Sequence, residues 1–395
     1  MIPRVLVLIV LLAVSAAPAA AQSDRAFRTF IADLWTDALT QGIDRATFER
    51  AFSGVAPDAR VIAATKRQPE YGRPAGSYVA SIASPARIAQ GQRQAKAWSR
   101  TLADVERRYG VDRRVVLAIW GMETAYGAIK PKWDAIRSLA TLAFIKYRDP
   151  FFREELLAAL QIMQSGQIPP GRLQASWAGA MGQPQFMPSS FRKFAVDFDG
   201  NGRIDIWSSV PDVLGSIGAY LQTHGWQSGT PWGFEVSVPK GFDLMRSRAS
   251  FSEWTGLGVR RADGGRFPDE GHGILFFPAG FPGPAFVATV NFDAIKTYND
   301  SDVYALSIGH LADRIAGGAP FKADWPKHGT QLPRDDRIAL QKQLAKLGYD
   351  QTRFTAHIDF KMRDFVRIEQ KKHGLTPDGH PDRALLERLG LRPSP

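Results

Sequence analysis

Apolar residues recur at helical spacing through much of the first 225 positions of this chain. The segment 27–38 shows this spacing, and the segments 87–109 and 112–126 repeat it on either side of Gly110. Between 232 and 298 the pattern changes to short β-like runs that are separated by Gly and Pro. The pattern predicts a mainly α chain of the α+β class, in which a helical region carries a small β-rich subdomain.

Two further breaks divide the chain, whose 395 residues suffice for two or three domains. A helical stretch at 302–315 is followed by the segment 319–332, whose Pro and Gly residues are typical of a linker. We therefore predict one large region over residues 22–318 and a separate small helical domain over residues 333–395.

The first 21 residues have the three parts of a secretory signal peptide. Arg4 supplies the positive charge, an apolar run follows over 5–12, and 19–21 offers an A-x-A cleavage site. The alternative is a transmembrane anchor, which needs about 20 apolar residues, and this run is shorter. We expect cleavage after Ala21 and a soluble periplasmic protein without a transmembrane anchor. Since the chain has no Cys, a lipid anchor, disulfides and a cysteine nucleophile are excluded as well.

The chain is basic, with 50 Lys and Arg against 39 Asp and Glu, and its net charge of +11 becomes +10 when Arg4 is removed. No run of five or six basic residues indicates nucleic-acid binding. Basic charge spread over a surface can serve solubility alone, but it would also suit a cell-wall polymer with acidic peptide stems. Charge leaves these two interpretations open.

Glu123 is a carboxylate on an otherwise apolar helix face. It follows Ile119 by four residues and Trp120 by three, so the three side chains share one face of a helix. Burial there would raise the pKa of the carboxyl group, which a general acid at neutral pH requires. A buried Glu with structural hydrogen bonds, or an apolar stripe that ends one turn earlier, would give the same pattern.

The segment 176–190 (SWAGAMGQPQFMPSS) is the second chemical feature. It combines small residues with the amide of Gln185, the ring of Phe186 and the thioether of Met187. Such mixtures of apolar faces and hydrogen-bonding groups are typical of sugar-binding surfaces. A close helix crossing built on Gly and Ala would look the same.

The loop 197–208 follows the EF-hand calcium pattern at most positions. Oxygen donors stand at positions 1, 3, 5 and 9, Gly202 stands at position 6, and position 7 binds through its backbone carbonyl. Position 12 is Ser208 where a bidentate Glu belongs, and Asp212 could supply that carboxylate. A metal-free turn of Asx and Gly residues is the alternative. The predicted calcium ligands are Asp197, Asp199, Asn201, Arg203 and Asp212.

Residues 120–127 (WGMETAYG), together with the segment 176–190, resemble motifs of the membrane-bound lytic transglycosylase B family. The resemblance runs from about residue 27 to residue 318, and it implies a lysozyme-like helical fold that acts on peptidoglycan. Further matching segments, in the same order, are 141–144, 195–207, 217–226 and 298–301.

The resemblance also implies roles for individual residues. Glu123 stands at the position of the family's single catalytic acid, and the 197–208 loop is similar to a calcium loop of the family. No organic cofactor is implied. The positions that match the family's glycan groove are Ser176, Gln185, Phe186, Tyr220, Tyr298, Asn299 and Tyr304, with Tyr78 and Arg148 resting on shorter matches.

The C-terminal domain has a resemblance of its own. Residues 338–349, Phe365, 373–379 and 385–389 resemble the small three-helix peptidoglycan-binding domain. The sequence departs from that pattern at 355–357, where an Asp-Gly turn is usual. The resemblance implies a domain that attaches the enzyme to the cell wall.

These motifs together predict a lytic murein transglycosylase. The resemblance implies that Glu123 acts first as an acid and then as a base on the β-1,4 bond between N-acetylmuramic acid and N-acetylglucosamine, leaving a 1,6-anhydro end. The alternatives are a hydrolytic muramidase, which would consume water, and a non-catalytic wall-binding scaffold. We expect a monomer that binds peptidoglycan strands and no nucleic acid.

Overall fold

The computed structural model describes residues 17–66, 74–166, 168, 173–326, 331–352 and 354–394. The chain forms two compact units: one consists of Met1–Thr65 and Trp133–Ala180, the other of Lys66–Lys132 and Met181–Pro395. Most of the predicted signal peptide, residues 1–16, lies outside the described residues. Within the part that is described, no helix combines the length and the apolar character needed to cross a membrane.

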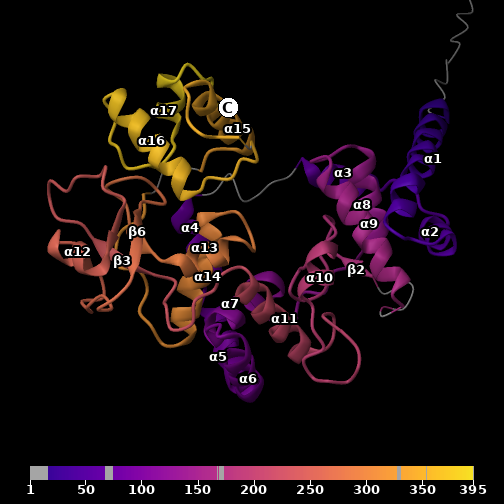
Figure 1. The fold of residues 1–395 in the computed structure, drawn as a ribbon, viewed down its shortest axis with the longest axis horizontal. Coiled ribbons are helices and arrows are strands. Elements are labelled where there is room, and N and C mark those ends of the chain that lie inside the picture. The colour runs from indigo at the N-terminus through magenta and orange to yellow at the C-terminus, as the bar shows by residue number, and fades with distance from the viewer. Residues whose placement is uncertain are drawn as a thin grey trace, which may run out of the picture. The chain divides into compact units, whose positions relative to one another are not determined.

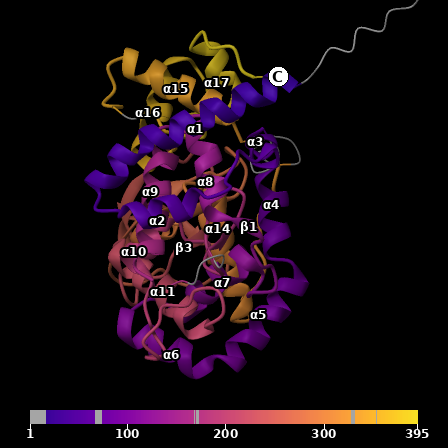
Figure 2. The ribbon, with the colours of Figure 1, turned by 90° about the vertical axis from the view of Figure 1, so that its right-hand side faces the viewer.

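The first unit is almost entirely helical. Phe27 near its N-terminus meets Phe144 edge to face, with ring centroids 5.3 Å apart. In Figure 2, α9 lies beside α8 and α2, which it contacts. The elements of this unit are α1 (Ala17–Thr40), α2 (Arg45–Phe52), α3 (Ala59–Thr65), β1 (Trp133–Asp134), α8 (Ala135–Phe144), α9 (Phe151–Gln164) and β2 (Gln174–Ala175).

The helical part of the second unit is built around α7 (Arg113–Thr124), which packs against four other helices (Figure 1). Its side chains from Val115 to Trp120 are at most 2% exposed, as the apolar pattern predicted. Asp112 caps the helix by accepting a hydrogen bond from the backbone N–H of Arg114. The neighbouring elements are α4 (Ala75–Ile82), α5 (Pro85–Ala97), α6 (Ser99–Tyr109), α10 (Pro188–Phe194), α11 (Val210–Thr223), α13 (Val290–Lys296) and α14 (Asp302–Ile315).

The single helix predicted over 87–109 is wrong at one point, because α5 and α6 are separate helices. They meet at Trp98, whose ψ of 22° leaves the helical region. The N–H of Trp98 still closes the last turn of α5 on Gln94, while its carbonyl accepts the first bond of α6 from Leu102. One residue thus ends one helix and begins the next.

The β-rich subdomain is a five-stranded antiparallel sheet in the order β4-β6-β7-β3-β5. The alternating and β-branched runs seen in the sequence form its three central strands. Aromatic and aliphatic side chains cover one face, with Trp254 of α12 fully buried among them. The elements are β3 (Gly233–Ser237), β4 (Arg248–Ser250), α12 (Phe251–Gly256), β5 (Arg260–Arg261), β6 (His272–Phe276) and β7 (Ala285–Ala288).

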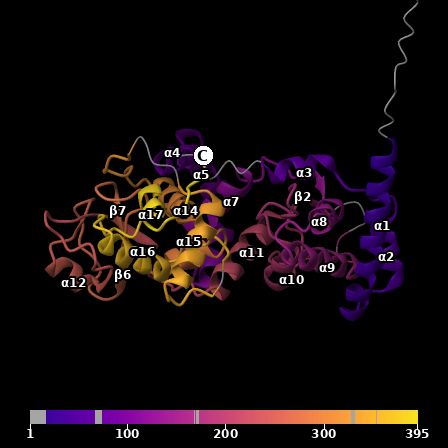
Figure 3. The same ribbon diagram turned by 90° about the horizontal axis from the view of Figure 1, so that it is seen from above.

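The C-terminal segment of the same unit has three helices, as predicted. They are α15 (Arg334–Lys346), α16 (Phe360–Lys372) and α17 (Arg383–Arg388), and they enclose a core that includes Leu340, Val366 and Leu385. Figures 1 and 3 both place α16 beside β6 of the sheet. The mainly α architecture with a small sheet and a helical C-terminal domain confirms the predicted fold class.

Candidate active site

Glu123 lies in the last turn of α7 and is half-buried. The helix ends immediately after it, because Ala125 and Tyr126 both adopt left-handed backbone conformations with φ of 51° and 59°. Such conformations cost free energy for residues with a Cβ atom and often occur at functional sites. Gly121 has no side chain, and a Cβ there would lie 2.4 Å from the Tyr126 ring. The ring therefore folds back against the helix behind Glu123.

Tyr304 on α14 donates a hydrogen bond from its hydroxyl to Oε1 of Glu123, at 2.5 Å. Its side chain is almost completely buried. Burial, followed by the negative charge of Glu123, raises the pKa of Tyr304 well above its usual value, so the phenol stays protonated.

An aromatic cluster adjoins this pair. The rings of Phe186, Tyr220 and Tyr298 contact one another, with centroids 4.8–5.9 Å apart. Burial, and then the negative charge of Glu123, raise the pKa of Tyr298 well above its usual value, so this phenol stays protonated as well. Only 2% of Phe186 and 8% of Tyr220 are exposed. These rings therefore mainly support the site and leave little face for a sugar.

The segment 181–186 is a tight turn that holds the aromatic cluster. Met181 and Phe186 exchange two backbone hydrogen bonds, and Gln185 has a φ of 55° and donates its amide to the Gly182 carbonyl at 2.8 Å. Tyr298 donates its hydroxyl to the Pro184 carbonyl at 2.7 Å. The structure thus brings Gln185, Phe186 and Tyr298 together.

Gln183 is a site residue that the sequence analysis missed. Its Oε1 accepts a hydrogen bond from the Trp120 indole at 2.7 Å, and its backbone carbonyl accepts one from Thr124 at 2.9 Å. Its amide donates to the Trp207 carbonyl. Gln183 therefore fastens the end of α7 to the 181–186 turn. Its position between Gly182 and Pro184, which favour a turn, was the signal in the sequence that could have indicated it. The bond to Trp120 could not be inferred from the sequence.

Two more predicted residues lie in this unit. Tyr78 is half-buried on α4, a helix that packs against the α14 helix of Tyr304. Asn299 is half-buried and directly follows Tyr298, and its backbone carbonyl accepts a bond from Ser301 at 2.7 Å.

Comparisons with known protein families extend this picture. Residues 26–313 match the family described as the transglycosylase SLT domain. The chain belongs to this family. Residues 333–389 match a family of peptidoglycan binding domains, so the SLT transglycosylase carries a second recognisable domain at its C-terminus.

Solved structures and a curated sequence are similar to this SLT transglycosylase. SltB3 from Pseudomonas aeruginosa, in complex with NAG-anhNAM-pentapeptide, is 44% identical with a TM-score of 0.81, and the match covers 92% of this chain and 99% of that one. SltB1 from the same organism is 31% identical with a TM-score of 0.63, covering 74% and 98%. The membrane-bound lytic murein transglycosylase B of Escherichia coli (strain K12) is 33% identical over 217 residues. This chain spans 58% of that relative's length, and the match covers 53% of this chain.

Ser176 and Arg148 belong to the first unit of the transglycosylase and are held by contacts within it. The Ser176 hydroxyl accepts bonds from the backbone N–H groups of Ala178 and Ala180, so it caps a turn. A Cβ on Gly179 in that turn would lie 2.4 Å from Leu139. The close packing here is made by a turn, because residues 176–187 form no helix and therefore no helix crossing. Arg148 is exposed, and its guanidinium lies 5.4 Å from the centroid of the Tyr147 ring.

The predicted calcium loop folds so that three carboxylates converge. Ligand atoms of Asp197, Asp199 and Asp212 lie within 4.8 Å of one another, so the structure brings Asp212 to the loop. Asp212 is fully buried and accepts bonds from the backbone N–H groups of Phe198 and Asp205. Burial raises its pKa. A cluster of hard oxygen donors is what Ca²⁺ prefers, so the donor set fits that ion.

The two other predicted ligands of the loop, Asn201 and Arg203, are exposed. The side-chain oxygen of Asn201 accepts a bond from the N–H of Arg203 at 2.9 Å. This contact forms an Asx turn within the loop.

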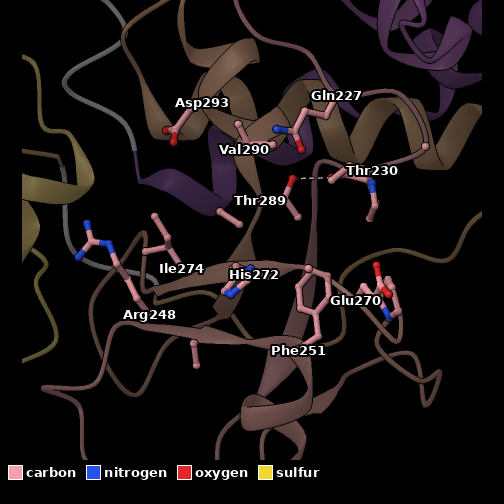
Figure 4. Close-up of a pocket in the computed structure, with 17 residues that line it drawn as sticks. Gln227, Thr230, Arg248, Phe251, Glu270, His272, Ile274, Thr289, Val290 and Asp293 are labelled. Carbon is pink, nitrogen blue, oxygen red and sulfur yellow. Dashed lines mark hydrogen bonds between the residues drawn. The ribbon is translucent and has the colours of Figure 1, made fainter.

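A cavity of about 540 Å³ opens elsewhere in the second unit (Figure 4). Arg248 of β4, His272 of β6 and Asp293 of α13 contribute its charged and titratable lining, with Glu270 on the connecting loop. None of the residues predicted from the sequence lines it.

Proposed function

We propose that this SLT transglycosylase cleaves the β-1,4 bond between N-acetylmuramic acid and N-acetylglucosamine in peptidoglycan. The observation that carries the proposal is the Glu123–Tyr304 pair at the end of α7, in a chain 44% identical to SltB3 across 99% of that protein. The SltB3 structure contains NAG-anhNAM-pentapeptide, a compound with an anhydro sugar. The same product class is proposed here.

In the proposed reaction Glu123 transfers its carboxyl proton to the glycosidic oxygen, and the bond between that oxygen and C1 of the muramic acid breaks. The acetamido group of the substrate stabilises the cation that develops at C1. The ionised Glu123 then removes the proton of the C6 hydroxyl, whose oxygen bonds to C1. No water is consumed, and the proton returns to Glu123. Tyr304 keeps the carboxyl group oriented in both steps.

The product decides between this reaction and the hydrolytic alternative. We expect the purified protein to release muropeptides from sacculi that are lighter by one water than the corresponding hydrolysis products, as measured by mass spectrometry. Products with reducing ends would instead identify a muramidase that uses water. Binding to sacculi without any release of muropeptides would identify a scaffold.

We also propose that the protein works in the periplasm as a monomer, with the C-terminal domain binding the cell wall. The signal-like N-terminus supports export, and the match of residues 333–389 to a peptidoglycan-binding family supports binding of the cell wall. The peptidoglycan strand is then the partner of both domains.

A structural Ca²⁺ held by Asp197, Asp199 and Asp212, with Asn201 and the carbonyl of Arg203, forms part of the proposal. The ion would tie the loop to the N-terminal turn of α11, where Asp212 lies. A related Escherichia coli structure, Slt35, is described in complex with calcium; it is 27% identical with a TM-score of 0.61, and the match covers 74% of this chain and 93% of that one.

Addition of Ca²⁺ is expected to raise the melting temperature, because an ion that binds only the folded state stabilises it. At a concentration one hundred times Kd the gain is about 2.7 kcal/mol. Asp197→Ala should remove this calcium-dependent gain, as measured by differential scanning fluorimetry with and without chelator. The control Asp243→Ala removes a comparable Asx-turn bond, from Met245, and should keep the gain. An equal response of both variants would contradict the site.

A further inference from the structure

The loop that follows α13 carries two of the predicted groove residues. It consists of residues 297–301, called the Tyr298 loop below, and it lies between the last residue of α13, Lys296, and the first residue of α14, Asp302. Tyr298 is in the loop itself, and Tyr304 follows it by less than one turn of α14. The position of this loop therefore affects Tyr298 in the aromatic cluster and Tyr304, which binds Glu123.

The two ends of the Tyr298 loop are joined by a buried ion pair. Nζ of Lys296 pairs with Oδ1 of Asp302, and each side chain is only 5% exposed. Burial opposes ionisation of Asp302, but the positive charges of Lys296 and Arg363 together outweigh it. The pKa of Asp302 therefore lies well below its usual value. A buried charge is tolerated when it is paired. Here the ion pair connects the residue before the Tyr298 loop to the residue after it.

The C-terminal domain supplies the remaining partners of this pair. Arg363 on α16 donates from Nε to Oδ2 of Asp302 at 3.0 Å, and it is also 5% exposed. Lys296 donates to the carbonyl of Ile358 at 3.1 Å. Both ends of the Tyr298 loop are thus held by residues of the C-terminal domain.

A third contact reaches the middle of the loop. Nδ1 of His357 lies 3.3 Å from the backbone carbonyl of Asp300 and 3.5 Å from its carboxylate. His357 falls in the segment 355–357, where the sequence departs from the peptidoglycan-binding pattern. The segment that differs from the peptidoglycan-binding pattern is therefore the one that contacts the Tyr298 loop.

The same helix α16 also contacts the sheet, independently of the loop. Arg367 donates to the Leu275 carbonyl of β6 at 2.9 Å, with 2% of its side chain exposed. Asp364 accepts a bond from Ser247 at 2.8 Å. Arg363 also lies 5.8 Å from the centroid of the Phe276 ring on β6. Arg367 and Asp364, in contrast, contact the sheet and not the loop, so their substitution tests docking of the domain separately from restraint of the loop.

We propose that the C-terminal domain is a positioning element of the active site: through Arg363, Ile358 and His357 it holds the Tyr298 loop and the start of α14. It thereby keeps Tyr304 on Glu123 and Tyr298 in the adjoining aromatic cluster. This inference rests on the proposed function. It assigns Arg363 a role as a positioning residue in addition to any binding of the cell wall by the domain.

The test compares full-length Arg363→Met with the matched control Arg367→Met. Both changes remove a buried guanidinium from α16 and keep an apolar stem, so both should lower the melting temperature. With a NAG-NAM tetrasaccharide bearing pentapeptides as substrate, Arg363→Met should lower kcat by about tenfold to a hundredfold, because small displacements of positioned groups have effects of this size. KM should change less than kcat, and Arg367→Met should keep kcat within about twofold.

Arg363→Lys should recover a large part of kcat, since an ammonium group can still pair with Asp302. Equal losses of kcat in Arg363→Met and Arg367→Met would overturn the proposal, because they would reflect docking alone. An unchanged kcat in Arg363→Met would overturn it too.

Hydrogen–deuterium exchange provides a readout that does not depend on activity. Amides of residues 297–304 should exchange faster in Arg363→Met than in Arg367→Met, and His357→Ala, at a partly exposed position, should show a smaller increase. If the wild-type protein cleaves nothing, the proposed function fails while this measurement still tests the restraint of the loop. Exchange at 297–304 that is the same in all the variants and in wild type would refute the restraint even in an active enzyme.

Discussion

Glu123→Gln is expected to abolish cleavage of peptidoglycan, with a loss of about a thousandfold or more. Gln keeps the size and the hydrogen-bonding capacity toward Tyr304, but it can neither donate the proton to the glycosidic oxygen nor remove the proton from the C6 hydroxyl. Both proposed steps are therefore lost together. Release of soluble muropeptides from sacculi, quantified by chromatography, measures the effect.

The variant should still bind sacculi and should melt close to the wild-type temperature, because the side chain is only half-buried. The matched control is Glu154→Gln, the same change at an exposed position in the first turn of α9, which should retain full activity. Substantial cleavage by Glu123→Gln would remove Glu123 from the proposed reaction and require another acid.

Asp302→Asn is expected to be the most destabilising of the substitutions considered, at about 3–5 kcal/mol near neutral pH. It leaves the charges of Lys296 and Arg363 buried without their carboxylate, and uncompensated buried charges carry costs of this size. The matched control is Asp300→Asn, two residues earlier, where the side chain is 72% exposed. An exposed pair of this kind contributes about 1 kcal/mol or less. Thermal unfolding followed by circular dichroism compares the two.

The effect should depend on pH with a definite sign. The pKa of Asp302 is lower in the folded protein than the ordinary value of 3.8 for an Asp carboxyl group, so its ionisation stabilises the fold above that value. The stabilisation is lost as pH falls through the folded pKa. The gap in melting temperature between wild type and Asp302→Asn should be widest above about pH 5 and should narrow below pH 4. A gap that stays constant over this range would show that charge is not the cause.

Local patterns in the sequence predicted the parts of the site that depend on one segment. Helical spacing placed Glu123 at the end of a buried helix, and the carboxylate spacing of the 197–208 loop led to a cluster that includes Asp212. The short β-like runs correctly located the central strands of the sheet. In each case the spacing of the apolar residues or of the metal-binding residues is visible within one short segment of the sequence.

The remaining features depend on contacts between distant segments, which periodicity does not encode. The bond from Tyr304 to Glu123 joins residues 181 positions apart. Arg363 looks in the sequence like a solvated charge on a basic helix, yet it is buried against Asp302. Charged residues are mostly exposed, so the sequence pattern predicts that they lie on the surface. The interface between α16 and α14 could therefore not be predicted from composition or spacing.

The first unit consists of two stretches of chain that are separated by α4 to α7 in sequence. Its second stretch begins with the strand β1, which pairs with β2, and continues into α8, whose terminal Phe144 packs on Phe27 of the first stretch. The unit can therefore be completed only after residue 180 has been synthesised, when helices of the other unit already exist. Removing α1 and α2 from the N-terminus would not excise the unit but would leave α8 and α9 with an uncovered aromatic face.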